Sequence, residues 1–80
     1  MEFNFKVDPH KLTTGELLEA ENDLARMNNL MSRFLVDLNG DPIPQEEAIV
    51  KLLGLSFADN YEAQQDFLAG LLRATRSGRR

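Results

Sequence analysis

The sequence contains no cysteine and no tryptophan, and it has a single histidine among its 80 residues. Without cysteine the chain has no disulfide, no thiolate nucleophile and no cysteine-ligated metal. No apolar run approaches the roughly 20 residues that span a membrane. The alternating start of the chain also differs from the apolar run of a signal peptide, so a cytosolic protein without membrane contact is the default expectation.

Residues that favour strands are few, because Val, Ile and Thr together number eight. Apolar residues nevertheless make up 42% of the chain, which suffices for one small core. We expect a mainly α fold of three to four short helices packed in a small bundle, with one N-terminal β-strand. The expected single domain covers residues 1–75, and residues 76–80 are expected to form a basic flexible tail.

Charge is unevenly distributed along the chain. There are 13 acidic and nine basic residues, and four of the nine are arginines within the last eight positions. Residues 1–72 therefore carry 13 acidic against five basic groups, a net charge of −8, and the remainder carries +4. Since an acidic body opposes contact with phosphates, we expect no nucleic acid as partner. The basic end is expected to be solvated; the alternatives are an arm for an acidic partner or nucleic acid, or neutralisation by a neighbouring copy.

Residues 2–7 alternate between apolar and polar side chains, with Phe3, Phe5 and Val7 on one face. A period of two is typical of a half-buried strand. We find no second convincing strand, because a return from residues 34–38 would contain prolines, which donate no hydrogen bond to a ladder. The strand is expected either to lie as an arm on the helices or to pair with another copy or a partner protein. We favour the second and expect a homo-oligomer.

The clearest local pattern predicts a helix beginning after Thr13. Thr13 and Glu16 have the spacing of a capping box, and Leu12 and Leu17 that of a hydrophobic staple. We predict a short helix from about 14 to 21 and a longer one to about 36, with Asn22 or Asp23 as a cap at a possible break. A stripe of apolar residues at steps of three and four is the expected core face: Leu17, Ala20, Leu24, Met27, Met31, Phe34 and Leu38.

Residues 39–44 have the composition of a loop. The spacing of Asp37, Asn39 and Asp41 resembles the start of a calcium loop, but the sixth and twelfth positions are Pro42 and Ala48 instead of glycine and glutamate. The pattern therefore indicates a turn.

Two more helices are predicted beyond this loop. The first begins at Pro44 and ends at Gly54, and the second is capped by Ser56 and frays near Thr75. The expected core face of the last helix is Phe57, Tyr61, Gln64, Leu68, Leu71 and Leu72, with Phe67 alongside.

No group of residues predicts catalysis. Glu16, Glu19 and Asp23 share one helix face, but this face points away from the apolar stripe, where carboxylates are solvated and poorly suited to acid–base work. There is no phosphate loop, dinucleotide motif or zinc spacing. We expect a non-enzymatic protein that holds no cofactor and no metal.

Two stretches carry a family resemblance: residues 5–19, where an LTTGEL helix start follows the short strand, and residues 33–44, which read RFLVDLNGDPIP. Together they resemble the small acidic tail assembly chaperones of long-tailed bacteriophages and prophages, over roughly residues 5–60. The resemblance implies a helical protein of the host cytoplasm. It would bind the tape-measure protein, keep it soluble and help to recruit tail-tube subunits.

The resemblance supplies no binding residues. From the residues themselves, apolar side chains in excess of one helix face are candidates for partner contact, together with the N-terminal strand: Phe3, Phe5, Val7, Leu30, Met31, Phe34 and Leu35. Two other functions stay open. One is a small acidic inhibitor of a host nuclease or polymerase, which would present carboxylates spaced like phosphates. The other is a minor structural protein of the virion.

Overall fold

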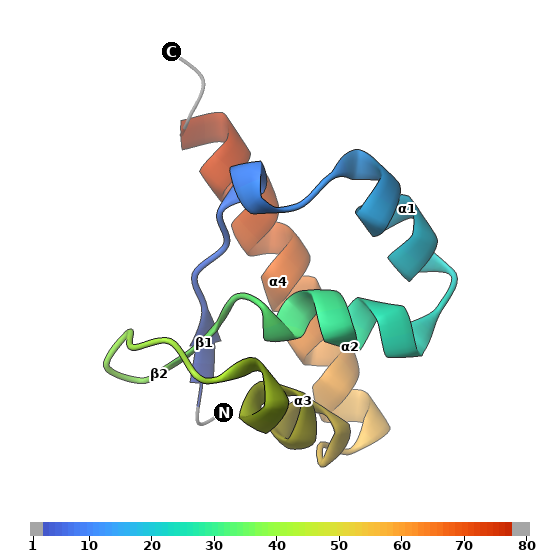
Figure 1. Cartoon of the computed structure of the whole chain (residues 1–80), viewed down its shortest axis with the longest axis vertical. Helices are drawn as coiled ribbons and strands as arrows, with labels where there is room; N and C mark the ends of the chain where they lie inside the picture. Colours follow the sequence, from blue (N-terminus) through green and yellow to red (C-terminus); the bar gives the residue numbers. More distant parts are fainter. Residues whose placement is uncertain (1–2, 78–80) are drawn as a thin grey trace.

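The computed structural model describes residues 3–77, and within them the mainly α prediction is confirmed. Four α-helices and a short two-stranded sheet make up this part of the chain (Figure 1). In chain order the elements are strand β1 (Phe3–Phe5), 3-10 helix η1 (Pro9–Lys11), helices α1 (Thr14–Glu21) and α2 (Leu24–Ser32), strand β2 (Leu35–Asp37), and helices α3 (Gln45–Leu53) and α4 (Phe57–Ser77).

The prediction of a single strand was wrong, because β1 has a partner within the chain. It pairs antiparallel with β2, so that Phe3 lies opposite Asp37 and Phe5 opposite Leu35. β2 exists because α2 ends earlier than predicted, at Ser32 instead of near residue 36. The main chain is then extended and pairs with β1. We had expected β1 to pair with another copy or a partner protein instead.

Pro42 and Pro44 lie in the loop that follows β2, and they do not prevent this loop from running back alongside β2. Pro42 forms a bridge with Val36, and the hydrogen bonds come from its surroundings: the Ile43 N–H donates to Leu35 O (3.1 Å), and the Asp37 N–H to Asp41 O (2.9 Å). Proline's missing donor is therefore not needed at this position.

The sequence that resembled a calcium loop forms a tight turn. One carboxylate oxygen of Asp37 accepts hydrogen bonds from the N–H groups of Asn39 (2.8 Å) and Asp41 (3.0 Å). Gly40 adopts a φ of 87°, which glycine tolerates better than other residues. The Asp37 carboxylate thus holds the turn together, in agreement with the prediction of a turn.

The predicted boundaries of α1 are confirmed together with its capping box. The Thr13 hydroxyl accepts from the Glu16 N–H (3.1 Å), and the Glu16 carboxylate accepts from the Thr13 N–H (2.9 Å). The chain breaks after α1, and Asp23 caps α2 by accepting from the N–H groups of Ala25 and Arg26. Of the two candidate caps, the structure therefore uses Asp23.

The predicted starts and ends of the last two helices are close to those observed. Pro44 precedes α3 by one residue, Gly54 follows it, and the Ser56 hydroxyl accepts from the Asp59 N–H (3.1 Å). α4 extends through Ser77, past the predicted fraying near Thr75. The boundary expected between domain and tail thus falls within α4, and the rest of the predicted tail, residues 78–80, lies outside the described residues.

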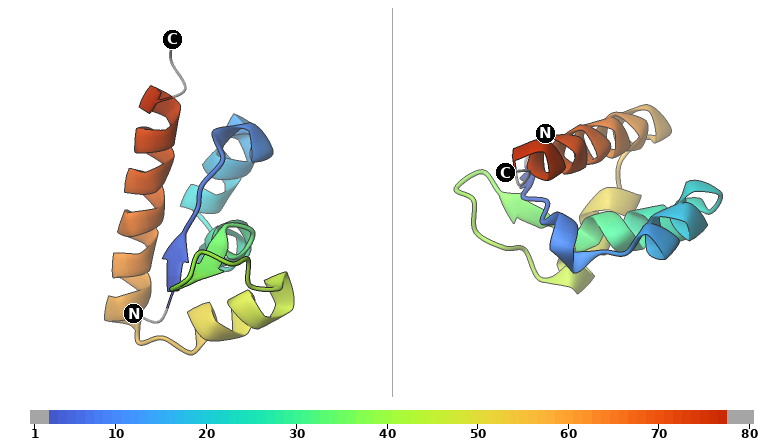
Figure 2. Two further views of the ribbon diagram at one scale, coloured as in Figure 1. Left: turned by 90° about the vertical axis from the view of Figure 1, so that its left-hand side faces the viewer. Right: turned by 90° about the horizontal axis from the view of Figure 1, so that it is seen from above.

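Figure 2 shows α4 along one side of the molecule, where it packs against β1, η1 and α2. At the centre of the core, the Phe67 ring contacts the rings of Phe5 (centroids 5.7 Å apart) and Phe34 (5.9 Å). The buried apolar cluster comprises Phe3, Ala20, Met27, Leu30, Met31, Phe34, Leu35, Ala48, Leu52, Ala63 and Phe67.

Two members of the predicted apolar stripe lie outside this core. Leu24, at the start of α2, and Leu38, just after β2, are exposed. A single helical stripe cannot include them, because the chain changes direction before α2 and becomes extended after it.

Candidate protein-binding surface

The residues that we expected to contact a partner lie in the core of the chain. Five of them are buried: Phe3, Leu30, Met31, Phe34 and Leu35. Phe5 and Val7 are half-buried and pack against the same cluster. The structure thus brings all seven together, but around Phe67 instead of on a surface. A role for them in partner binding stays a prediction, and it would require the fold to open.

The exposed apolar residues are a different set. Three of them, Leu24, Leu53 and Phe57, lie near the meeting point of α2, α3 and α4, and this clustering makes the surface a candidate for binding. The large apolar side chains exposed within residues 3–77 are Leu18, Leu24, Leu38, Val50, Leu53, Phe57, Tyr61 and Leu72.

Three helix ends form a groove, which we call the corner groove: the start of α2, the end of α3 and the start of α4. Its walls are apolar and include Leu24, Leu53, Leu55 and Phe57. Leu53 is 64% exposed and Phe57 is 73% exposed, so these side chains have little contact with their own chain. The corner groove therefore offers an apolar surface without a partner in the described part of the chain.

Two amide side chains, Asn28 from α2 and Asn60 from α4, also line this groove. The Asn60 amide donates to Asn28 Oδ1 (2.7 Å) and to Leu52 O (3.2 Å), and it accepts from Gln64 Nε2 (3.0 Å). The Asn28 amide in turn donates to Leu24 O (2.9 Å). These amides are already hydrogen-bonded within the chain, so a ligand does not need to supply hydrogen-bond partners for them. The groove therefore favours apolar side chains.

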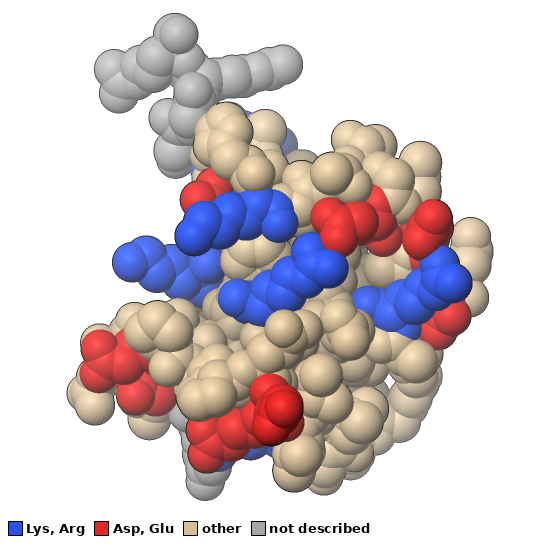
Figure 3. All heavy atoms as spheres, in the orientation of Figure 1, with Lys and Arg blue, Asp and Glu red and all other residues tan. Residues whose placement is uncertain are grey.

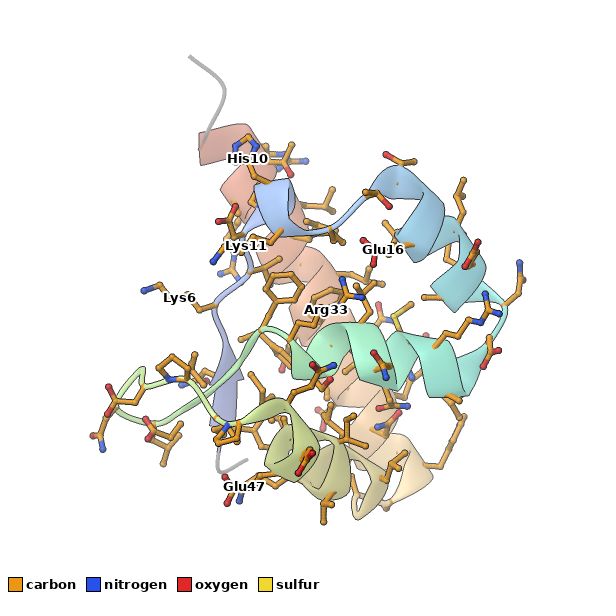
Figure 4. All side chains as sticks on the ribbon, viewed as in Figure 1. Lys6, His10, Lys11, Glu16, Arg33 and Glu47 are labelled. Atoms are coloured by element: carbon orange, nitrogen blue, oxygen red, sulfur yellow. The ribbon has the colours of Figure 1, made fainter. Side chains whose placement is uncertain are left out.

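The row of carboxylates on α1 and before α2 is paired with arginines. Arg33 contacts Glu16 (2.7 Å; both residues are labelled in Figure 4), and Arg26 contacts Glu19 (2.7 Å) and Asp23 (3.5 Å). The hydrogen bond from the Thr13 backbone, with that from Arg33, lowers the pKa of Glu16 below its usual value. A carboxyl group that acts as a general acid near neutral pH needs the opposite shift. The arrangement therefore does not favour acid catalysis.

Cationic side chains form a row across one face of the molecule (Figure 3). Lys6, next to β1, and Lys11, in η1 beside α4, lie on this face with Arg33 (Figure 4). Unlike Arg33, neither lysine has a carboxylate within ion-pair distance among residues 3–77. The row brings together charges that are dispersed in the sequence. A hollow beside Arg33 is lined by Arg26 and also by Glu16 and Glu19, so its cations are already paired with carboxylates.

Two further properties of residues 3–77 bear on the expected classes of function. None of their helices is both long and apolar enough to cross a lipid bilayer. They also contain no group of three or more His, Asp or Glu side chains arranged to hold a metal ion.

Sequence reasoning missed the outward residues of α4. Phe57, Tyr61 and Leu72 were expected in the core, but they are exposed, and the buried face instead contains Asn60 and Ala63 with Phe67. One available signal was the small residues Ala63, Gly70 and Ala74, which share a face with Phe67 and allow close packing. Comparison of the chain with protein-family models, with curated proteins and with solved structures found no match.

Proposed function

We propose that this chain is a non-enzymatic assembly factor that binds an apolar helical segment of another protein in the corner groove. The observation that carries the proposal is the exposure of Leu53 and Phe57, which line this groove together with Leu24. Apolar side chains gathered at one place and bordered by polar surface are typical of protein-binding sites. A partner helix would cover them with its own apolar face.

The resemblance to tail assembly chaperones suggests which helical segment this is. A tape-measure protein is long, helical and apolar, so a small helical protein with an apolar groove would protect it before assembly. The two stretches that carry the resemblance include the capping box at Thr13 and the turn at Asp37. They therefore support a shared scaffold, whereas the proposed contact rests on the corner groove.

The arginine pairs argue against the acidic inhibitor. A mimic of nucleic acid needs carboxylates that are free to replace phosphates on one face. Glu16, Glu19 and Asp23 each contact Arg26 or Arg33 instead. This face therefore does not favour the inhibitor, whereas the carboxylates of α4, Asp59, Glu62 and Asp66, form no ion pair within residues 3–77.

A pair of matched variants tests the groove. Leu53→Glu places a charge in the corner groove, and Leu38→Glu does the same at an equally exposed leucine (66%) outside it. The probe is a 20-residue amphipathic peptide of leucine, alanine and lysine, titrated into the labelled protein and followed by NMR, with a scrambled peptide as control. We expect shifts at Leu24 and Leu53, at least tenfold weaker binding by Leu53→Glu, and no change with Leu38→Glu. Equal binding by Leu53→Glu or by the scrambled peptide would contradict the proposal.

The identity of the partner is tested separately. The chain is co-expressed with the tape-measure protein of the genome that encodes it, and the soluble fraction of that protein is measured. We expect the soluble fraction to rise with the wild-type chain and with Leu38→Glu, but not with Leu53→Glu. Peptide binding without this rise would retain the groove and reject the tail-assembly role.

A further inference from the structure

We propose that two copies of this chain pair antiparallel through the outward side of α4. The contact uses the α4 stripe, which we define as Phe57, Tyr61, Leu68 and Leu72. This inference goes beyond the proposed function, since it concerns self-association, and it differs from our expectation of pairing through the N-terminal strand. β1 already pairs with β2 within the chain, and the contact proposed here uses a different surface.

Three residues of the α4 stripe are exposed apolar side chains, and the fourth, Leu68, packs partly against the core. Its residues are spaced by four, seven and four positions, which places them on one side of a helix. Tyr61 is 54% exposed, Leu72 is 59% exposed, and Leu68 is half-buried. α4 lies along one side of the molecule (Figure 2), and the exposure of Phe57, Tyr61 and Leu72 leaves these side chains open to a second helix.

The order of residues along the stripe is symmetric about the point between Gln64 and Gln65. In an antiparallel pair centred there, Phe57 of one copy lies opposite Leu72 of the other, and Tyr61 lies opposite Leu68. Each of the two aromatic residues of the stripe thus lies opposite a leucine of the other copy. Gln64 and Gln65 of both copies lie next to the twofold axis. A self-complementary patch of this kind is what a twofold dimer requires.

Charge favours antiparallel pairing at long range. Four of the charged side chains do not border the α4 stripe: Asp59 and Glu62 line a hollow with residues of α3, and Asp66 and Arg73 line one with β1. The first half of α4 contains three acidic residues and no basic one, and the second half contains two basic residues and no acidic one. Antiparallel pairing places the acidic half of each helix beside the basic half of its partner, whereas parallel pairing juxtaposes like charges. Within residues 3–77, none of the five forms an ion pair with its own chain: Asp59, Glu62, Asp66, Arg73 and Arg76.

The size of the contact predicts a reversible dimer. α4 has 21 residues and is therefore about 31 Å long. Each copy contributes one stripe of four apolar side chains, a patch of a few hundred Å², so the total area lies at the low end for specific interfaces. We expect dissociation in the micromolar range.

Sedimentation equilibrium of the full chain from 5 to 500 µM measures the association. We expect a monomer–dimer equilibrium that Leu72→Glu weakens at least tenfold, with the matched variant Leu38→Glu unchanged. The corner groove and the α4 stripe share Phe57, but Leu53 belongs to the groove alone and Leu72 to the stripe alone. Leu53→Glu is therefore expected to leave the dimer intact, and the two variants distinguish failure of one proposal from failure of the other. Circular dichroism confirms that each variant is folded. A monomer at every concentration, or an unchanged association constant for Leu72→Glu, would overturn the proposal.

The absence of native cysteine permits a direct test of direction. Gln65→Cys places a thiol near the twofold axis of the antiparallel pair, where two copies meet. Leu72→Cys places the two thiols about 20 Å apart in that pair, but close together in a parallel one. Under mild oxidation we expect disulfide-linked dimers from Gln65→Cys and few from Leu72→Cys. Efficient cross-linking of Leu72→Cys, or none of Gln65→Cys, would refute the antiparallel arrangement.

Discussion

The inward and outward faces of α4 differ in a way that hydrophobicity alone does not predict. The inward face buries Asn60, Ala63 and Phe67, of which only the last is a large apolar residue. The outward face carries Phe57 and Leu72, both exposed. A face is therefore buried because its shape and hydrogen bonds fit its neighbours, and not because it carries the most apolar side chains.

Small residues let α4 approach the rest of the chain closely. Gly70 illustrates this, because a Cβ atom at this position would lie 3.4 Å from Val7 Cγ2. Phe67 then fills the space between Phe5 and Phe34, whose rings it contacts. The larger residues of the outward face have no such space to fill within the described chain and remain at the surface.

The largest expected effect comes from making the same substitution, phenylalanine to alanine, on the two faces of α4. Phe67→Ala removes a fully buried ring and is expected to lower the free energy of unfolding by about 3–5 kcal/mol. Phe57→Ala removes an exposed ring and should change it by no more than about 0.5 kcal/mol. Urea denaturation at a protein concentration well below the dissociation constant expected for the proposed dimer measures both.

If Phe67→Ala does not fold, the milder pair Phe67→Leu and Phe57→Leu retains the comparison. If substitution of Phe57 lowered the free energy of unfolding as much as substitution of Phe67, the outward face would be buried in the isolated chain.

A smaller effect is expected from the amide that the inward face buries. Asn60→Leu removes the donor to Asn28 Oδ1 and leaves this buried oxygen without its partner. We expect a loss of about 1–3 kcal/mol in the free energy of unfolding. The double variant Asn28→Leu/Asn60→Leu removes both groups and should recover part of the loss. The single variant Asn28→Leu completes the cycle, and a loss in the double variant equal to the sum of the two single losses would mean that the amides do not interact.

The smallest expected effect concerns an exposed interaction, the contacts of Glu16. Because these contacts lower the pKa of Glu16 in the folded state, they stabilise the fold above the ordinary glutamate pKa of about 4.5. This contribution is lost as the pH falls through the lowered pKa. Glu16→Gln keeps a side-chain acceptor for the cap and removes the charge. Thermal melting between pH 3 and pH 6 should show a smaller decrease at low pH for the variant than for the wild type. Identical curves would exclude a role for the Glu16 charge.

The helix ends were predictable from sequence because each cap is a local hydrogen bond. Thr13 with Glu16, and Ser56 with Asp59, are three residues apart, so their geometry follows from the helix start itself. The binding surface was not predictable in this way. The seven residues proposed for it are large and apolar, and the same property places them in the core. Separating the two roles requires knowledge of which helix covers which face.

By itself, the sequence determined the mainly helical class, the capped starts of the helices, the turn at Asp37 and the lack of thiol chemistry. These features depend on composition or on residues within a few positions of each other. The tertiary structure alone decided the pairing of Phe3 with Asp37, the contact of Asn60 with Asn28, and the side of α4 that remains exposed. Each of these joins segments about 30 residues or more apart or depends on such contacts, and burial is a property that packed elements share, so no single segment encodes it.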